Sequence, residues 1–356
     1  MKKNTYIVTG GAGFIGSNFT CHWLENNTDD EIVVLDNLSY AGNIANLKAV
    51  QNNPRLHFIP GDIADKRLVK KILAEYEPAG IFHFAAETHV DRSIVFPEYF
   101  LKTNVIGTYK LLEAVKEYWD SLPEIRKQNF RFIHISTDEV YGSLEFSDPP
   151  FTENSPYKPN SPYAASKAAA DHFVRAYIKT YSFPAIITHS VNNFGPAQFP
   201  EKLIPLTILH ALTGKKIPVY GDGKQRRNWL YVREHCKALE AIMKKGRAGE
   251  QYNIGTHDEM TNIELVTEIC NRMDQLLPDS KYVPHSNLIS FVKDRPGHDR
   301  RYAVDSTKIK NETGWQPSRD FDAMMLHTIR TFIREYQENP TVGMFPVYES
   351  EKKGMT

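Results

Sequence analysis

The first half of the chain alternates between two patterns of apolar residues. Short runs rich in β-branched side chains are typical of buried parallel strands, and they lie at residues 6–9, 32–36, 56–59, 81–85, 130–136 and 185–190. Between them are longer stretches, such as 103–119 and 163–181, in which apolar positions repeat at the spacing of an amphipathic helix. This alternation predicts an α/β fold, with a Rossmann-type doubly wound parallel sheet.

The alternation weakens past about residue 192, where prolines interrupt the sequence and Gly221 and Gly223 indicate a tight turn. We therefore expect a first domain over residues 1–191 and a smaller, mixed α/β second domain over 192–356. Strand-like runs at 229–232 and 252–254 predict that the chain crosses back to the first domain at about 228–256. The polar stretch after Gly343 is expected to be a loose tail.

Composition and charge narrow the class of protein. The 43 basic and 43 acidic residues cancel, which argues against nucleic acid or an anionic membrane as a partner. The three cysteines, Cys21, Cys236 and Cys270, are scattered, so neither a disulfide framework nor a metal site is expected. The chain has no segment typical of a signal peptide and no run of about 18 apolar residues. We therefore expect a soluble, cytoplasmic protein.

A glycine-rich turn directly follows the first predicted strand. The sequence G-G-A-G-F-I-G at residues 10–16 runs into a helical pattern, so that backbone N–H groups at the helix N-terminus can approach a pyrophosphate. Asp36 closes the second predicted strand 20 residues beyond Gly16, where a carboxylate can bind the adenosine ribose. Because a carboxylate repels a 2′-phosphate, these residues predict NAD rather than NADP as the cofactor of the first domain.

A tyrosine followed four residues later by a lysine places both side chains on one helix face, where the ammonium can lower the phenol's pKa from about 10. The pattern occurs at three pairs: Tyr163 and Lys167, Tyr220 and Lys224, Tyr348 and Lys352. Only the first lies on a well-defined predicted helix, 26 residues beyond Thr137 at the carboxyl end of the 130–136 strand. Doubly wound folds bind ligands at that end of their strands. Tyr163 is therefore the candidate base for a sugar hydroxyl.

Four segments resemble the extended short-chain dehydrogenase/reductases that act on sugar nucleotides. They are T-G-G-A-G-F-I-G, H-F-A-A-E-T-H-V-D-R-S, S-T-D-E-V-Y-G and S-P-Y-A-A-S-K. Within that superfamily, the triplet at residues 137–139 is similar to the one that marks the 4,6-dehydratases, whereas related epimerases lack its acidic pair. Similarity to the dTDP-glucose 4,6-dehydratase family spans nearly the whole chain, continuing through N-N-F-G-P, E-K-L-I-P, N-W-L-Y-V, Y-N-I-G and D-R-P-G-H-D-R-R-Y.

The resemblance implies a reaction on dTDP-glucose in which NAD oxidises C4, water is lost across C5 and C6, and hydride returns to C6. It implies Glu139 as the base for the C5 proton and Asp138 as the acid, because hydroxide is a poor leaving group. For this role Asp138 must stay protonated near neutrality, which burial or a neighbouring carboxylate would favour by raising its pKa. Thr137 would hydrogen-bond the C4 oxygen and assist Tyr163, with Lys167 completing the catalytic set.

The expected NAD contacts come from the glycine turn, the strand ends and the catalytic helix: Gly10, Gly13, Phe14, Ile15, Gly16, Asp36, Asn37, Leu38, Ser39, Asp62, Ile63, Ala85, Ala86, Thr88, Thr103, Tyr163, Lys167 and Asn193. The resemblance implies substrate contacts mostly from the second domain, the expected sugar-nucleotide domain: Thr88, Thr137, Asn192, Lys202, Leu203, Pro218, Val219, Tyr220, Arg227, Asn262, Asp294, Arg295, Pro296, Gly297 and His298. Arginine suits bidentate contacts with phosphate.

The chain departs from the family pattern at two places. It reads H-S-V-N-N-F-G-P from His189, where N-C-S-N-N-Y-G-P is expected. It also reads R-R-N at residues 226–228, where an apolar residue, Arg and Asp are more usual. Both segments keep the paired asparagines or the arginine that the resemblance assigns to the ligands.

Two other classes of function remain open, a sugar-nucleotide epimerase or uronate decarboxylase, and a non-catalytic NAD-binding scaffold. The Asp138 and Glu139 pair argues against the first class. The joint presence of Thr137, Tyr163 and Lys167 argues against the second. By analogy with the family we also expect a homodimer, formed by two long helices of each subunit that begin near Thr103 and Tyr163.

Overall fold

The computed structural model describes residues 4–256 and 259–340, so the predicted tail after Gly343 lies outside the described residues. The chain forms two compact units, each built from three separate segments. Unit 1 comprises the chain up to Asn193, Gln225–Met260 and Arg295–Ser318. Unit 2 comprises Phe194–Lys224, Thr261–Asp294 and the chain from Arg319. The chain returns to unit 1 twice, whereas one return was predicted from the sequence.

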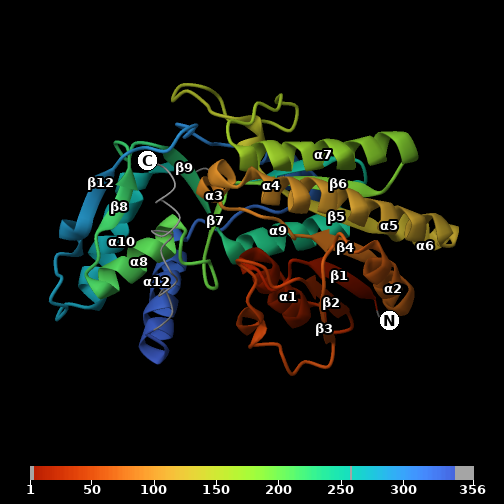
Figure 1. Ribbon diagram of the computed structural model, residues 1–356, viewed down its shortest axis with the longest axis horizontal. Helices are drawn as coiled ribbons and strands as arrows, with labels where there is room; N and C mark the ends of the chain where they lie inside the picture. The colour runs from red at the N-terminus through yellow and green to blue at the C-terminus, as the bar shows by residue number, and fades with distance from the viewer. Residues whose placement is uncertain (1–3, 257–258, 341–356) are drawn as a thin grey trace. The chain divides into compact units, whose positions relative to one another are not determined.

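A seven-stranded sheet forms the centre of unit 1, with strand order β10-β6-β5-β4-β1-β2-β3 (Figure 1). All six neighbouring pairs are parallel, which confirms the predicted Rossmann-type sheet. The strand bounds are β1 Thr5–Thr9, β2 Glu31–Asp36, β3 Leu56–Pro60, β4 Gly80–His83, β5 Arg131–Thr137, β6 Ala185–Ser190 and β10 Gln251–Ile254. The last of these is the predicted crossing back.

Helices cover both faces of this sheet, because neighbouring residues of a strand point to opposite sides. One core packs α1 (Phe14–Asn26) and α9 (Val232–Lys245) against side chains such as Val8. The other packs α2 (Lys66–Tyr76), α5 (Thr108–Ser121) and α7 (Pro162–Tyr181) against side chains such as Ile7. Both faces of the inner strands are therefore buried, which explains their continuous apolar runs, whereas the residues of the edge strand β3 are only partly buried or exposed.

A π-helix precedes α5, where the sequence predicted a regular helix from residue 103. It spans Leu101–Gly107 and is labelled η2. Its Asn104 accepts a hydrogen bond from the Glu87 N–H at 2.8 Å and donates to the Glu87 carbonyl at 3.0 Å and to Ser166 Oγ at 2.8 Å. The wider turn therefore coincides with a buried amide that connects η2 to α7 and to the segment after β4.

The remaining elements of unit 1 are short and lie at the ends of the sheet strands. A second sheet has the order β11-β9-β7. The elements are η1 Ile44–Leu47, α3 Val90–Val95, α4 Pro97–Phe100, α6 Glu124–Asn129, η3 Asp138–Tyr141, β7 Asn192–Phe194, β9 Arg226–Tyr231, β11 Glu259–Thr261 and α11 Thr307–Thr313. The predicted strand at 229–232 is therefore part of β9 and lies outside the central sheet.

Unit 2 is a smaller α/β arrangement. Its strands β8 (Ile217–Tyr220) and β12 (Ile289–Val292) pair in parallel. Helix α8 packs against α10 and α12, and η4 packs against α10. The bounds are α8 Leu203–Thr213, α10 Asn262–Leu276, η4 His285–Leu288 and α12 Phe321–Glu338. Across the described residues of both units, no helix combines the length and apolar character needed to span a membrane.

Candidate active site

The glycine turn after β1 has a backbone that larger residues would disrupt. Gly10 has φ of +69°, and a Cβ on it would lie 2.6 Å from the backbone nitrogen of Ala85. A Cβ on Gly16 would lie 2.3 Å from the carbonyl oxygen of Gly10. Helix α1 begins at Phe14, with Gly13 as an N-cap that offers no side-chain hydrogen bond and with no acidic residue in its first turn. The first N–H groups of α1 can therefore bind an anion such as a pyrophosphate.

Asp36 ends β2 and fixes the loop beside the glycine turn. Its carboxylate is 6% exposed and accepts hydrogen bonds from the N–H of Ala12 at 2.9 Å and of Leu38 at 2.8 Å. Burial raises the pKa of Asp36, and these two hydrogen bonds oppose the rise. Each carboxylate oxygen accepts one of these two bonds, so both keep capacity for a ribose hydroxyl.

The other residues expected near NAD surround these two. Asp62 accepts from the N–H of Ala64 at 2.8 Å, and Ile63 is buried in the core beneath α2. Strand β4 ends at His83, two residues earlier than the sequence predicted, so Ala85 lies just after the strand. The N–H of Ala85 donates to Thr9 Oγ1 at 3.3 Å. The remaining positions are found in these places: Asn37, Leu38 and Ser39 after β2, Ala86 and Thr88 after β4, Thr103 in η2.

Asn193 has a fixed orientation in unit 1. Its Nδ2 donates to Ser190 Oγ at 3.1 Å and to the Val191 carbonyl at 2.9 Å. Its Oδ1 lies 2.9 Å from Nδ1 of the buried His235. The amide side chain is therefore held from both ends.

The acidic triplet stands at the carboxyl end of β5, where the strand becomes η3. Thr137 Oγ1 donates to Asp138 Oδ1 at 3.4 Å and accepts from the N–H of Glu139 at 3.3 Å. The side chain of Thr137 also acts on Tyr163 of α7, where it lowers the pKa of the phenol, and the charges of Asp138 and Glu139 raise it. Asp138 is only 2% exposed, whereas Glu139 is partly exposed. The structure thus brings the triplet and the tyrosine together.

Asp138 is in an environment that favours its protonated form. Burial, reinforced by the negative charge of Glu139, raises the pKa of Asp138 to about 8. The positive charge of Arg227 opposes the rise. The predicted elevation of this pKa is confirmed, and a carboxylic acid that keeps its proton at neutrality can act as a general acid.

Lys167 and Tyr163 differ from the sequence expectation in one respect. Lys167 is 4% exposed, and its Nζ donates to the carbonyl of Ile135 in β5 at 2.8 Å. Burial lowers the pKa of Lys167 to about 8. The pKa of Tyr163 is raised well above 10 by burial and by the charge of Glu139, rather than lowered as predicted. The lowering expected from the Lys167 ammonium is therefore wrong for this arrangement, because burial and the charge of Glu139 dominate the pKa of Tyr163.

The residues expected to contact substrate belong to both units. Unit 1 holds Thr88, Thr137, Asn192, Arg227, Arg295, Pro296, Gly297 and His298. Unit 2 holds Lys202, Leu203, Pro218, Val219, Tyr220, Asn262 and Asp294. Of these, Lys202 is the N-cap of α8, Pro218 lies in β8, and Asn262 begins α10.

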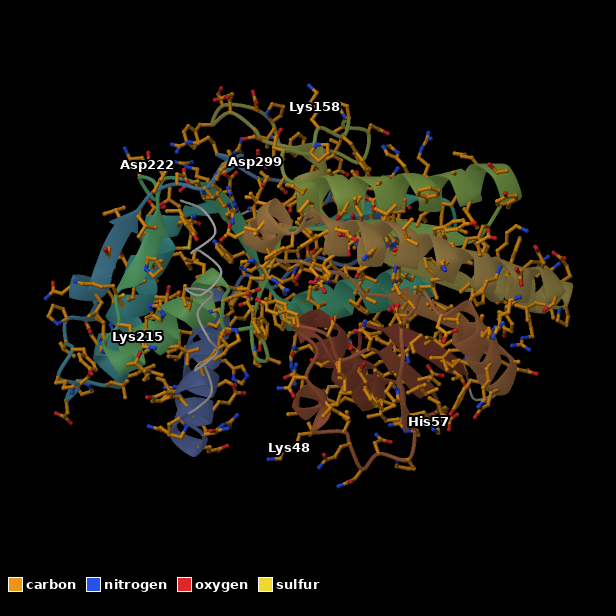
Figure 2. The ribbon with its side chains drawn as sticks, in the orientation of Figure 1. Lys48, His57, Lys158, Lys215, Asp222 and Asp299 are labelled. Carbon is orange, nitrogen blue, oxygen red and sulfur yellow. The ribbon has the colours of Figure 1, made fainter. Side chains whose placement is uncertain are left out.

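Arg227 and Arg295 already have partners within unit 1. Arg227 is 4% exposed, donates to the carbonyl of Asp299 at 2.8 Å, and lies 4.1 Å from the ring centroid of Tyr302. Asp299, labelled in Figure 2, also accepts from Asn160 at 2.6 Å. Arg295 lies 3.3 Å from a carboxylate oxygen of Asp91. A diphosphate would therefore replace or supplement these contacts.

A group of buried polar residues that was not predicted from the sequence lies behind the catalytic pair. Its centre is Asp171, 1% exposed, with His134 and His189 within hydrogen-bond distance of its carboxylate. Two signals were available, since Asp171 follows Lys167 by four residues and His189 replaces an expected asparagine.

Comparison with known proteins assigns the chain to a family. A sequence profile described as GDP-mannose 4,6 dehydratase matches residues 7–328. A dTDP-glucose 4,6-dehydratase of Neisseria gonorrhoeae is 50% identical over 334 residues, covering 93% of this chain and 96% of the relative. The enzyme of that name from Escherichia coli is 50% identical over 361 residues, covering 98% and 99%. The chain belongs to the dTDP-glucose 4,6-dehydratase family.

The fold agrees with solved structures of the same family. A dTDP-glucose 4,6-dehydratase from Streptomyces venezuelae, solved with NAD bound, superimposes with a TM-score of 0.84. It is 43% identical, and the match covers 94% of this chain and 97% of that one. Family membership therefore rests on sequence and on fold together.

Proposed function

We infer that the chain is a dTDP-glucose 4,6-dehydratase, which converts dTDP-glucose to dTDP-4-keto-6-deoxyglucose. The observation that carries this function is the buried Asp138 beside Glu139, both acting electrostatically on Tyr163, in a chain half identical to relatives of that name. Loss of water requires both an acid and a base, whereas oxidation at C4 alone requires neither carboxyl group.

NAD fits the residues at the start of unit 1. The glycine turn leaves no room for a Cβ at Gly10 or Gly16, which supports a close approach of backbone to a pyrophosphate. Asp36 would accept from the adenosine ribose hydroxyls. When bound, NAD supplies the chemistry of hydride acceptance from C4 and hydride return to C6.

Oxidation at C4 uses the residues of α7 and the end of β5. Tyr163 takes the proton of the C4 hydroxyl, and Thr137 hydrogen-bonds the C4 oxygen. Because burial and the charge of Glu139 raise the pKa of Tyr163, the ammonium of Lys167 has to stabilise the phenolate against them. One of its three protons is bonded to the Ile135 carbonyl, which leaves two for other acceptors.

Dehydration uses the acidic pair. The 4-keto group makes the C5 proton acidic, and Glu139 removes it. Asp138 gives its proton to the C6 oxygen, so that the C6–O bond breaks and water leaves. The raised pKa of Asp138 supports this division, because a protonated acid is present near pH 7. Arg227 and Arg295 would contact the diphosphate of the substrate.

The test separates oxidation from dehydration. In Asp138→Asn and Glu139→Gln, we expect reduced cofactor to form on dTDP-glucose while formation of the 4-keto-6-deoxy product falls by at least about 100-fold. Product is measured by its alkaline absorbance, and oxidation by the absorbance of reduced cofactor. The exposed replacements Asp120→Asn and Glu98→Gln serve as matched controls and should keep wild-type turnover. Unchanged dehydration in both active-site variants would refute the assignment.

We also propose a homodimer. Large apolar side chains are exposed on η2, α5 and α7, the helices expected to pair: Leu101 at 54%, Ile106 at 48%, Tyr109 at 38%, Phe173 at 41% and Tyr181 at 46%. Contiguous exposed apolar side chains are typical of protein interfaces. Tyr109 and Phe173 contact each other across α5 and α7, with ring centroids 5.9 Å apart, so these helices present one surface.

A cytoplasmic location is proposed on the state of the cysteines. Cys21, Cys236 and Cys270 are all free thiols. Free, unpaired thiols are typical of the reducing cytoplasm.

A further inference from the structure

Three successive residues of β5 hold one face of α7. His134 Nε2 lies 3.0 Å from Asp171 Oδ1, and Ser136 Oγ donates to Asp171 Oδ2 at 2.8 Å. Between them, the carbonyl of Ile135 accepts from Lys167 Nζ at 2.8 Å. Residues 134 and 136 point to the same side of the strand, and residues 167 and 171 lie on one face of the helix. These contacts join the strand that ends in the acidic triplet to the helix that carries the catalytic tyrosine.

A second layer of contacts encloses the Asp171 carboxylate. His189 Nε2 of β6 lies 3.2 Å from Asp171 Oδ2. The Tyr157 hydroxyl donates to the same oxygen at 3.1 Å and lies 2.6 Å from His189 Nε2. The Tyr141 hydroxyl lies 3.1 Å from His189 Nδ1. His189 therefore lies within hydrogen-bond distance of both tyrosine hydroxyls as well as the Asp171 carboxylate.

Asp171 is a charged group in this enclosure. Burial alone would raise its pKa, but hydrogen bonds from His134 and His189 outweigh burial and hold the pKa of Asp171 well below its usual range. Burial lowers the pKa of His134 to about 4, so this histidine is neutral near pH 7. The negative charge of Asp171 opposes the effect of burial on Lys167. The two side chains are thus a buried carboxylate and ammonium one helical turn apart.

We propose that Asp171 is a positioning residue for the catalytic pair. The negative charge of its buried carboxylate keeps Lys167 protonated. The hydrogen bonds of the same carboxylate with His134 and Ser136 fix α7 against the end of β5. The role rests on the proposed function, because Lys167 acts there through Tyr163. Asp171 itself contacts neither substrate nor cofactor in this role and exchanges no proton.

Other titratable groups act electrostatically on Asp171, Lys167 or Tyr163 and contribute to the pH dependence measured on them. They are His83 of β4, His134 of β5, Asp138, Glu139 and Tyr141 of η3, Tyr157 of the following loop and His189 of β6. Asp138 is the most important of these because it changes charge in the same pH range as Lys167.

The first experiment measures Lys167 directly and needs no substrate. The pH dependence of the Nζ ¹⁵N chemical shift is followed in lysine-labelled protein, with Lys167→Met identifying the signal. In Asp171→Asn, we expect Lys167 to lose its proton at a pH lower by about one unit or more, because an opposite charge at this range shifts a pKa by roughly 1–3 units. Asp171→Glu, which keeps the charge, should restore most of the difference, and the exposed control Asp120→Asn should titrate like wild type.

The second experiment measures the consequence for C4 oxidation. The pH profile of single-turnover oxidation of dTDP-glucose is recorded in the Asp138→Asn background, so that the titration of Asp138 does not contribute. Adding Asp171→Asn should move the alkaline limb of the rate to lower pH by the same amount as the Nζ titration. A residue with a merely structural role would lower the rate or the melting temperature without moving this limb.

The outcomes separate the two proposals. An unchanged Nζ titration in folded Asp171→Asn overturns the role of Asp171, whatever the activity. If that variant does not fold, Asp171→Ser, which is smaller and also uncharged, is measured in its place. A shifted titration in a wild-type background that does not dehydrate dTDP-glucose would instead leave the electrostatic role standing and refute the proposed function.

Discussion

A single residue, Asp138, combines two demands that conflict. As a general acid it must be protonated near neutrality, and burial beside Glu139 raises its pKa from 3.8 to about 8. The same burial makes its ionised form unfavourable in the folded chain. The unfolded chain exposes the carboxyl to water and ionises it at an ordinary pH, so the folded state loses stability wherever Asp138 is forced to ionise.

This conflict predicts the pH dependence of stability. The folded state binds the Asp138 proton more tightly than the unfolded state does. This difference contributes fully to the free energy of unfolding below about pH 4. The contribution is lost at roughly 1.4 kcal/mol per pH unit as pH rises to about 8. In Asp138→Asn this loss should be absent. Thermal unfolding between pH 5 and 9 should therefore show that the free energy of unfolding of the variant increases relative to wild type by several kcal/mol as pH rises. Parallel melting curves for the two proteins would contradict it, and exposed Asp120→Asn is the control.

At the scale of elements, β5, β6 and α7 meet around one buried carboxylate. His189 of β6 contributes through both ring nitrogens, toward Asp171 and Tyr157 on one side and Tyr141 on the other. An asparagine at this position would be too short to reach partners on both sides. The enclosure of Asp171 therefore depends on this histidine.

Replacement of His189 should weaken the contacts that hold β5, β6 and α7 together around Asp171. In His189→Asn we expect a loss of about 1–3 kcal/mol of unfolding free energy, because buried hydroxyls of Tyr141 and Tyr157 lose a partner. Denaturant unfolding measures it. The partly exposed His57, labelled in Figure 2, gives the control His57→Asn, which should change stability by no more than about 0.5 kcal/mol. Equal losses of unfolding free energy in His189→Asn and His57→Asn would argue against a special role of His189 in holding these elements together.

The sequence predicted those parts of the fold that depend on local patterns. The strands from β1 to β6 were evident from their apolar runs, since most of them are buried on both faces, and the turn at Gly10 from its short-range spacing. Tyr163 was found from its spacing to Lys167 on a predicted helix, whereas the acidic triplet was assigned through the resemblance to the dehydratase family. The π-helix and the Asp171 enclosure were not, since each is set by contacts with other elements, such as Asn104 with Ser166. The direction of the Tyr163 pKa also required knowledge of burial.

For the whole molecule, the proposed dimer makes the next prediction. Light scattering after size exclusion should give twice the chain mass of 40.8 kDa for wild type. Ile106→Glu combined with Phe173→Glu should give the monomer, because two buried charges without partners oppose association. The exposed Phe291→Glu in β12 of unit 2 is the control and should leave the mass unchanged. A monomeric wild type would overturn the dimer.

The interleaving of the two units limits how the gene can be divided. Residues that complete the seven-stranded sheet are encoded after the first segment of unit 2, because β10 follows α8 and β8 along the chain. A truncation at Asn193 would leave β6 as an open edge with unpaired backbone groups, which is a hazard for aggregation. Neither unit can therefore be expressed as one contiguous fragment. During synthesis, the ribosome must produce the chain through β10 before the central sheet can be completed.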